Sequence, residues 1–126
     1  AEITKRIPFP GPALATRIVG EVTEERLATV RAATAIVEEE LGGSRAFQYM
    51  AVLLNDRATG IQEGRREFGQ IIVVRCIHSV DARTATAVKI PWKKLFRICE
   101  RITSIKGVNR CLYDLTPKPP ATIEYI

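Results

Sequence analysis

Cysteine and histidine are scarce in this sequence of 126 residues, which has three cysteines and one histidine, His78. No CxxC pair and no cysteine–histidine spacing typical of a zinc site occurs, so we expect no metal site, no redox pair and no thiol-protease centre. Cys76, Cys99 and Cys111 lie among apolar residues and are interpreted as small hydrophobic core residues. Free thiols in apolar surroundings favour a reducing, cytoplasmic location.

Long apolar runs are also missing. No stretch approaches the roughly 20 apolar residues of a membrane-spanning helix, and the opening residues AEITKR lack the apolar segment of a secretory signal. The sequence therefore predicts no membrane partner. The net charge of +5 is modest and its arginines are scattered rather than gathered in one stripe, so charge alone does not favour nucleic acid as a partner.

The composition that remains suits one compact domain. Hydrophobic residues make up 46% of the chain and charged residues 26%, which is enough for a core that can fold alone. We expect a single domain over 1–126, with a Pro/Gly-rich segment at 1–22 and an α+β body and tail at 23–126. Three prolines and a glycine within positions 8–12 make the first segment an ordered, kinked loop or a linker.

Two helices are predicted from apolar residues at helical spacing. Thr23 is a suitable N-cap for a first helix, and Gly42-Gly43 would end it. A second helix would start with Pro91 at its first position and end at Gly107. The expected buried faces are Leu27, Val30, Val37 and Leu41 in the first helix, and Leu95, Ile98, Cys99, Ile102 and Ile105 in the second.

Four strands are predicted around these helices. Phe47–Leu54 and Ile71–Ile77 are apolar runs of strand length, Val108–Asp114 is a third, and Thr122–Tyr125 is a short fourth strand at an edge. The polar stretch Asn55–Gln70 between the first two is best explained as a solvated loop. The order helix-strand-strand-helix-strand-strand predicts an α+β two-layer sandwich with a mostly antiparallel sheet and both helices on one face. The other face would be left apolar, so we expect a homodimer.

The end of the chain, Thr116 to Ile126, has a Pro119-Pro120 pair between a lysine and a glutamate. Prolines favour extended backbone, so this tail is expected to leave the body as a short rod. Lys118 offers a charged donor, Thr122 a hydroxyl and a backbone N–H, and Glu124 an acceptor, a set that suits a ligand with phosphate and hydroxyl groups. A plain edge strand entered through prolines is the alternative interpretation.

Several segments together resemble the C-terminal dimerisation domain of GMP synthase (glutamine-hydrolysing). The resemblance covers essentially the whole chain and is carried by Pro8-Phe9-Pro10-Gly11-Pro12, Arg17 to Glu21, Gln48, Arg57, Gly60, Arg66, Ser79 to Ala85, Gly107 to Arg110, Tyr113 to Thr116 and Lys118 to Glu124. The chain departs from the family pattern at Ile7, at Ala13 and in its last two residues, Tyr125 and Ile126.

The resemblance implies the last domain of an enzyme that adenylates xanthosine monophosphate (XMP) with ATP and magnesium and then uses ammonia from glutamine to form GMP. The family's ATP-pyrophosphatase loop and its amidotransferase triad do not occur here, so ATP and magnesium would bind in another domain. This chain is expected to hold no catalytic residue and no cofactor. Its implied partners are a second copy, XMP, the ATP-pyrophosphatase domain and the glutamine amidotransferase domain or subunit.

The family's nucleotide contacts map onto Lys118 and Glu124. Thr122 and Ile123 would add backbone N–H donors to the phosphate, and Pro10 and Gly11 would form part of the pocket wall, unless that loop is an interdomain hinge. Gln48 resembles a family glutamine near the purine base, although a polar residue at a strand edge explains it as well.

Arg57 and Arg66 remain open between a solvated loop and a phosphate contact, in the same subunit or across the dimer. For the whole chain, a stand-alone dimerisation or regulatory subunit is an open alternative. A KH-type nucleic-acid module is disfavoured, because Gly60 and Gly64 are one residue too far apart for its Gly-x-x-Gly loop.

Overall fold

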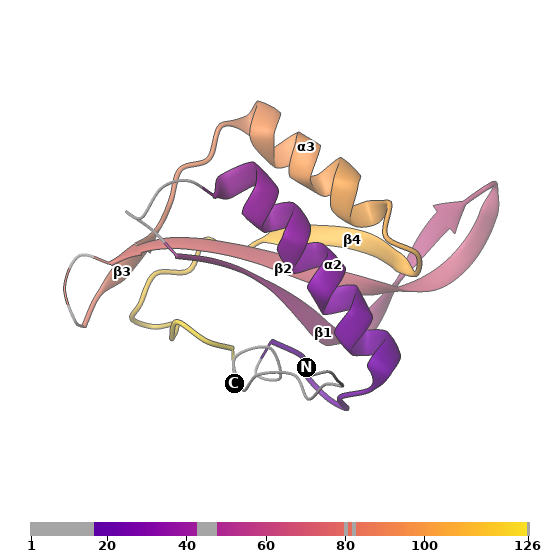
Figure 1. Ribbon diagram of the computed structural model, residues 1–126, viewed down its shortest axis with the longest axis horizontal. Coiled ribbons are helices and arrows are strands. Elements are labelled where there is room, and N and C mark those ends of the chain that lie inside the picture. The colour runs from indigo at the N-terminus through magenta and orange to yellow at the C-terminus, as the bar shows by residue number, and fades with distance from the viewer. Residues whose placement is uncertain (1–16, 43–47, 80, 82, 126) are drawn as a thin grey trace, which may run out of the picture.

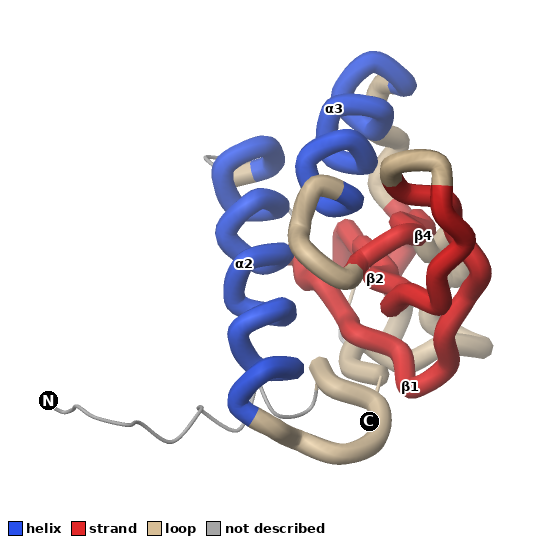
Figure 2. Tube along the Cα trace, turned by 90° about the vertical axis from the view of Figure 1, so that its right-hand side faces the viewer, coloured by secondary structure: helices blue, strands red, loops and turns tan. Residues whose placement is uncertain are grey.

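The computed structural model describes residues 17–42, 48–79, 81 and 83–125. Within them the elements follow the order α2 (Glu24–Leu41), β1 (Gln48–Gln62), β2 (Arg65–Ser79), β3 (Ala85–Ala87), α3 (Trp92–Thr103) and β4 (Val108–Tyr113). Both helices lie on one face of the sheet, and the C-terminal segment runs along the other (Figure 1). A side view shows the helix layer against the strand layer (Figure 2). The predicted α+β two-layer fold is therefore confirmed.

Helix α2 begins and ends where its sequence predicts. The Thr23 hydroxyl accepts a hydrogen bond from the Arg26 N–H at 3.1 Å, which caps the first turn. Gly42 follows the last helical residue and donates its N–H to the Glu38 carbonyl at 2.7 Å. All four apolar residues expected on the inner face are buried: Leu27, Val30, Val37 and Leu41.

Helix α3 is shorter than predicted. Pro91 is its N-cap instead of its first helical residue, and the helix ends at Thr103, four residues before Gly107. The hydroxyls of Thr103 and Ser104 donate back to the carbonyls of Cys99 and Glu100, both at 2.8 Å. Such bonds compete with further helical turns. A tight turn follows and leads into β4.

Strands β1 and β2 form a hairpin much longer than predicted. The polar stretch Asn55–Gln70 is not a loop, because the antiparallel ladder continues from the Arg57–Gln70 pair to the Gln62–Arg65 pair. Glu63 and Gly64 both have positive φ, 52° and 77°, as the central residues of a type I′ hairpin turn require. The arm has polar residues on both faces and few apolar ones, so its sequence did not show strand periodicity; it projects beyond the helices (Figure 1).

Strand β2 is the centre of the sheet. It pairs with β1 along one side, and with β3 (antiparallel) and β4 (parallel) along the other. The expected fourth strand at Thr122–Tyr125 is wrong, since these residues form no ladder. Their polar groups bond to side chains instead: the Thr122 carbonyl accepts from Arg75, and the Glu124 carbonyl accepts from the Thr122 hydroxyl. The fourth strand of the sheet is instead β3, which is only three residues long.

Apolar side chains fill both sides of the sheet. The main core lies between the helices and the sheet. On the opposite face Met50, Val52 and Val73 are buried, with Ile123 and Tyr125 of the tail packed against them. The tail therefore covers a face that was expected to be bare. A bare face no longer argues for the predicted homodimer, which stays a prediction.

Neither helix of the described residues combines the length and the apolar composition needed to cross a bilayer.

Candidate functional site

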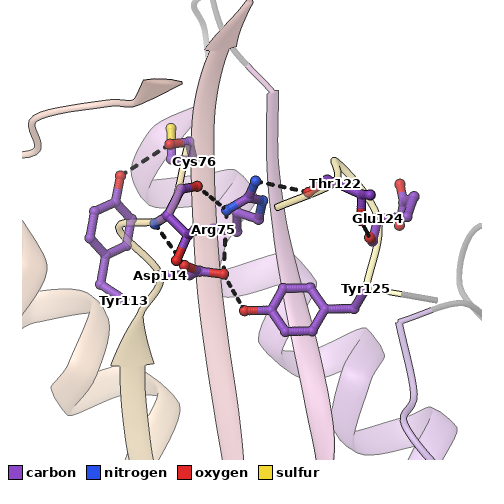
Figure 3. Close-up of polar contacts among 8 residues, drawn as sticks. Arg75, Cys76, Tyr113, Asp114, Thr122, Glu124 and Tyr125 are labelled. Carbon is purple, nitrogen blue, oxygen red and sulfur yellow. Dashed lines mark hydrogen bonds and ion pairs between the residues drawn. The ribbon is translucent and has the colours of Figure 1, made fainter. Parts of the chain in front are cut away.

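A buried arginine organises the tail face. Arg75 lies in the middle of β2 with 0% of its surface exposed. Its Nη1 donates to the Thr116 carbonyl and its Nη2 to the Thr122 carbonyl, each at 2.9 Å. Figure 3 shows the guanidinium pointing from β2 toward Thr122 and Asp114. One side chain thus holds two points of the chain that lie six residues apart.

Asp114 balances the charge of this guanidinium. Its Oδ2 lies 3.3 Å from Arg75 Nη1 and also accepts a hydrogen bond from the Tyr125 hydroxyl. The Thr116 N–H donates to Oδ1 at 2.8 Å. Burial alone would raise the pKa of the Asp114 carboxyl, but the hydrogen bonds from Tyr125 and Thr116 and the charge of Arg75 together hold it below its ordinary value. The carboxylate is therefore ionised at neutral pH.

Lys118 is anchored through its backbone to strand β3. Its N–H donates to the Ala85 carbonyl at 2.9 Å, and its own carbonyl accepts from the Ala85 N–H at 3.1 Å. The Lys118–Pro119 and Pro119–Pro120 peptide bonds are cis. The chain turns over this stretch, and the Ala121 N–H donates to the Pro117 carbonyl at 2.9 Å. The tail is therefore a compact turn on the surface of the sheet, and the expected rod is wrong.

The remaining predicted tail residues follow this turn. The exposed Thr122 donates its hydroxyl to the Glu124 carbonyl at 2.5 Å. Ile123 packs against the buried cluster of Met50, Val52 and Val73. The Glu124 carboxylate lies 3.3 Å from Nη2 of Arg17. Tertiary structure thus gathers Lys118, Thr122, Ile123 and Glu124 on one face around Arg75.

Gln48 shares this face and this end of the sheet. Gln48 is the exposed first residue of β1 and pairs with Ile77 of β2. It precedes Met50 by two positions, so its side chain is on the same face as that of Met50, which lies under the tail. Lys118 pairs with Ala85, which in turn pairs with Ser79 of β2. The backbones at Gln48 and Lys118 are therefore about three strand spacings apart across the sheet, roughly 14 Å, and offset by about two residues along the strands.

Arg57 and Arg66 lie elsewhere. Arg57 lines a cleft of about 510 Å³ together with α2 residues, Phe68 of β2 and Lys106, so it is on the helix face. Arg66 lies further along the same side of the hairpin, beside Thr59 and Phe68. Within one chain the two arginines are on the face opposite to the tail. Pro10 and Gly11 fall outside the described residues.

Sequence reasoning missed Arg75 and Asp114. The signal for Arg75 was a single charge inside the apolar run Ile71-Ile-Val-Val-Arg-Cys-Ile77. A charged residue in a fully buried strand requires a partner, so the run itself could have directed attention to this position. Its partners come from far along the chain and were not predictable in the same way.

Of the three cysteines expected in the core, Cys76 is buried, whereas Cys99 and Cys111 are only partly buried. Burial raises the pKa of the Cys76 thiol to about 11. Burial, together with the neighbouring Cys99, raises the pKa of the Cys111 thiol to about 12. Thiols with such values are protonated at neutral pH and are poor nucleophiles. Among the described residues no cluster of three or more histidine, cysteine, aspartate or glutamate side chains could hold a metal ion.

Comparisons with known proteins agree on one family. The family model "GMP synthase C terminal domain" matches residues 35–125. The chain is 52% identical to a GMP synthase (glutamine-hydrolyzing) subunit from Pyrococcus furiosus, 53% to that from Archaeoglobus fulgidus and 48% to that from Methanopyrus kandleri, with 98% of the chain covered each time. It spans only 41% to 42% of the length of these relatives. The chain therefore belongs to the family of GMP synthase C-terminal domains.

Proposed function

We propose that this chain is the dimerisation and XMP-binding domain of a GMP synthase. The complete enzyme would convert XMP to GMP with ATP and with ammonia from glutamine, in purine nucleotide biosynthesis. Its ATP and magnesium site and its amidotransferase would lie in other domains or subunits. The chain alone would catalyse nothing.

The observation that best supports XMP binding is the ordered tail. Lys118 is anchored through its backbone to Ala85, which leaves its side chain for a ligand. The Lys118 ammonium would bind the phosphate, assisted by the N–H groups of Thr122 and Ile123, and Glu124 would accept from a ribose hydroxyl or orient the lysine. Gln48, at the same end of the sheet, would contact the base of a nucleotide lying across that end.

The test is the substitution Lys118→Ala in the complete enzyme. Loss of a charge-assisted phosphate contact should weaken XMP binding by roughly 1.5 to 3 kcal/mol, about ten- to hundredfold. Lys93→Ala, which removes an exposed lysine of α3, is the matched control. An XMP KM that is the same in both variants would contradict the assignment. Titrating XMP into this domain while following tail amide chemical shifts would then show whether the domain binds alone.

Dimerisation is proposed to use the projecting hairpin. Ile61 and Phe68 lie on the same face of this arm and are 72% and 74% exposed. Exposed large apolar residues on a protruding element are typical of an interface. Arg57 and Arg66 share that face, so any phosphate contact that they make would go to the nucleotide of the second copy.

A further inference from the structure

We infer that Arg75 is a positioning residue for the nucleotide: it sets the place of Lys118 without touching the ligand. The inference rests on the proposed function of the tail. It also separates two groups of tail residues, those that bind the nucleotide and those that hold the binding segment in place.

Arg75 holds both ends of the turn that carries Lys118. The two carbonyls that Arg75 holds belong to Thr116 and Thr122. These residues bracket Pro117 to Ala121, so the guanidinium fixes both ends of the turn that carries Lys118. Ala85 of β3 supplies a third support at Lys118 itself. A segment held at both ends and in its middle cannot shift relative to the sheet while these bonds remain.

Burial of Arg75 makes its bonds to the tail hard to give up. Arg75 is fully buried, so it is out of reach of a ligand, and a buried charge is tolerated only when it is paired and hydrogen-bonded. Its guanidinium bonds to the two carbonyls of the tail and pairs with Asp114, which the tail residue Tyr125 also contacts. Lifting the tail would strip this charge of both carbonyl partners. The tail is thus locked to the sheet more firmly than its apolar contacts through Ile123 and Tyr125 alone would achieve.

Arginine suits this position better than lysine would. A guanidinium is a planar fork that can donate to two carbonyls in different directions, whereas a lysine is a single flexible point charge. Arg75→Lys keeps the charge opposite Asp114 but cannot reproduce both carbonyl bonds. This substitution therefore tests positioning separately from charge. Arg31→Lys, at an exposed site on α2, is the matched control.

The experiment measures two quantities in the full-length enzyme: the KM and kcat for XMP, and amide hydrogen exchange at Lys118 and Ala121. Losing one hydrogen bond to the turn should raise the XMP KM about tenfold and speed exchange at these two amides by a similar factor. The kcat, the ATP KM and exchange in the core of β1 and β2 should match those of Arg31→Lys. If Arg75→Lys fails to fold, Tyr125→Phe, which removes a hydrogen bond to Asp114, replaces it and should act in the same direction.

Three results would overturn the inference. If Lys118→Ala raises the XMP KM but folded Arg75→Lys changes neither KM nor tail exchange, Arg75 has no positioning role and the proposed function stands. If the KM rises without faster exchange at Lys118 and Ala121, Arg75 acts in another way. If neither Lys118→Ala nor Arg75→Lys changes the XMP KM, the proposed function itself fails, and with it the role of Arg75 toward the nucleotide.

Discussion

Arg17 and Glu124, which are 107 residues apart in the sequence, form an ion pair with Nη2 3.3 Å from Oε2. Arg17 is fixed beside β1, where its carbonyl accepts from the Leu53 N–H at 2.9 Å. The pair therefore joins the first described residue to the tail. It also gives Glu124 a charged partner before any ligand arrives, so a ligand hydroxyl would have to share this carboxylate with Arg17.

Substitutions at this pair should distinguish a structural role of Glu124 from a role in ligand binding. We expect both Arg17→Met and Glu124→Gln to lower the free energy of unfolding by less than about 1 kcal/mol, because the pair is partly exposed. If Glu124 accepts from the nucleotide, Glu124→Gln should weaken XMP binding about tenfold, and Arg17→Met by clearly less. Chemical denaturation and XMP titration measure the two effects. Equal losses of affinity would assign Glu124 a purely structural role.

Asp114 should make the stability of the domain depend on pH in the acidic range. Its folded pKa lies below the ordinary value of 3.8, so the unfolded chain binds more protons between the two values. Its contribution is fully present above about pH 5 and is lost as the pH falls through the folded pKa. Urea midpoints measured from about pH 6 down to about 2.5 should show a smaller fall for Asp114→Asn than for the wild type. Identical slopes would contradict the lowered pKa.

Gly69 should be required because the Asn109 side chain lies against it. A Cβ at Gly69 would overlap Asn109 Nδ2, and one at Gly60 would come 2.5 Å from the same atom. This nitrogen is held in place, since it donates to the Ala58 carbonyl at 2.8 Å. Gly69→Ala should therefore lower the free energy of unfolding by roughly 1 to 3 kcal/mol.

A double-mutant cycle would test this explanation. Asn109→Ala alone removes the bond to the hairpin and should destabilise by about 1 kcal/mol. In that background the added methyl of Gly69→Ala no longer meets the amide and lies 3.1 Å from the Cβ of residue 109, so its effect should become clearly smaller. Additive losses would show that the close contact with Asn109 is not the reason for glycine.

The proposed dimer surface makes a further prediction. Phe68→Glu places a charge on the exposed face of the hairpin and should shift the chain from dimer to monomer in light scattering at micromolar concentration. Trp92→Glu, at an equally exposed aromatic on α3, is the control and should leave the dimer intact. A wild-type chain that scatters as a 14.0 kDa monomer would refute dimerisation by this domain alone.

Predictions from the sequence succeeded where the signal is local. Thr23 and Gly42 delimit α2 because a cap and a glycine act on the adjacent turn, and the helical spacing of Val30 and Val37 identified its buried face. They failed for the hairpin arm, because a strand with mostly polar residues on both faces has no clear periodicity that distinguishes it from a loop. They failed also for the tail, where proline favoured extended geometry and tertiary contacts imposed a turn.

The amino-acid order alone is enough to establish the two-layer α+β class, most of the core, and membership of the GMP synthase C-terminal domain family, since these depend on apolar spacing and on motifs along the chain. How the tail lies and what holds it depend instead on tertiary contacts. Arg75 lies 41 residues from Thr116 and 47 from Thr122, and no local pattern connects such distant groups. Burial of the guanidinium in β2 is what forces them together, because a buried charge must find its partners wherever folding brings them.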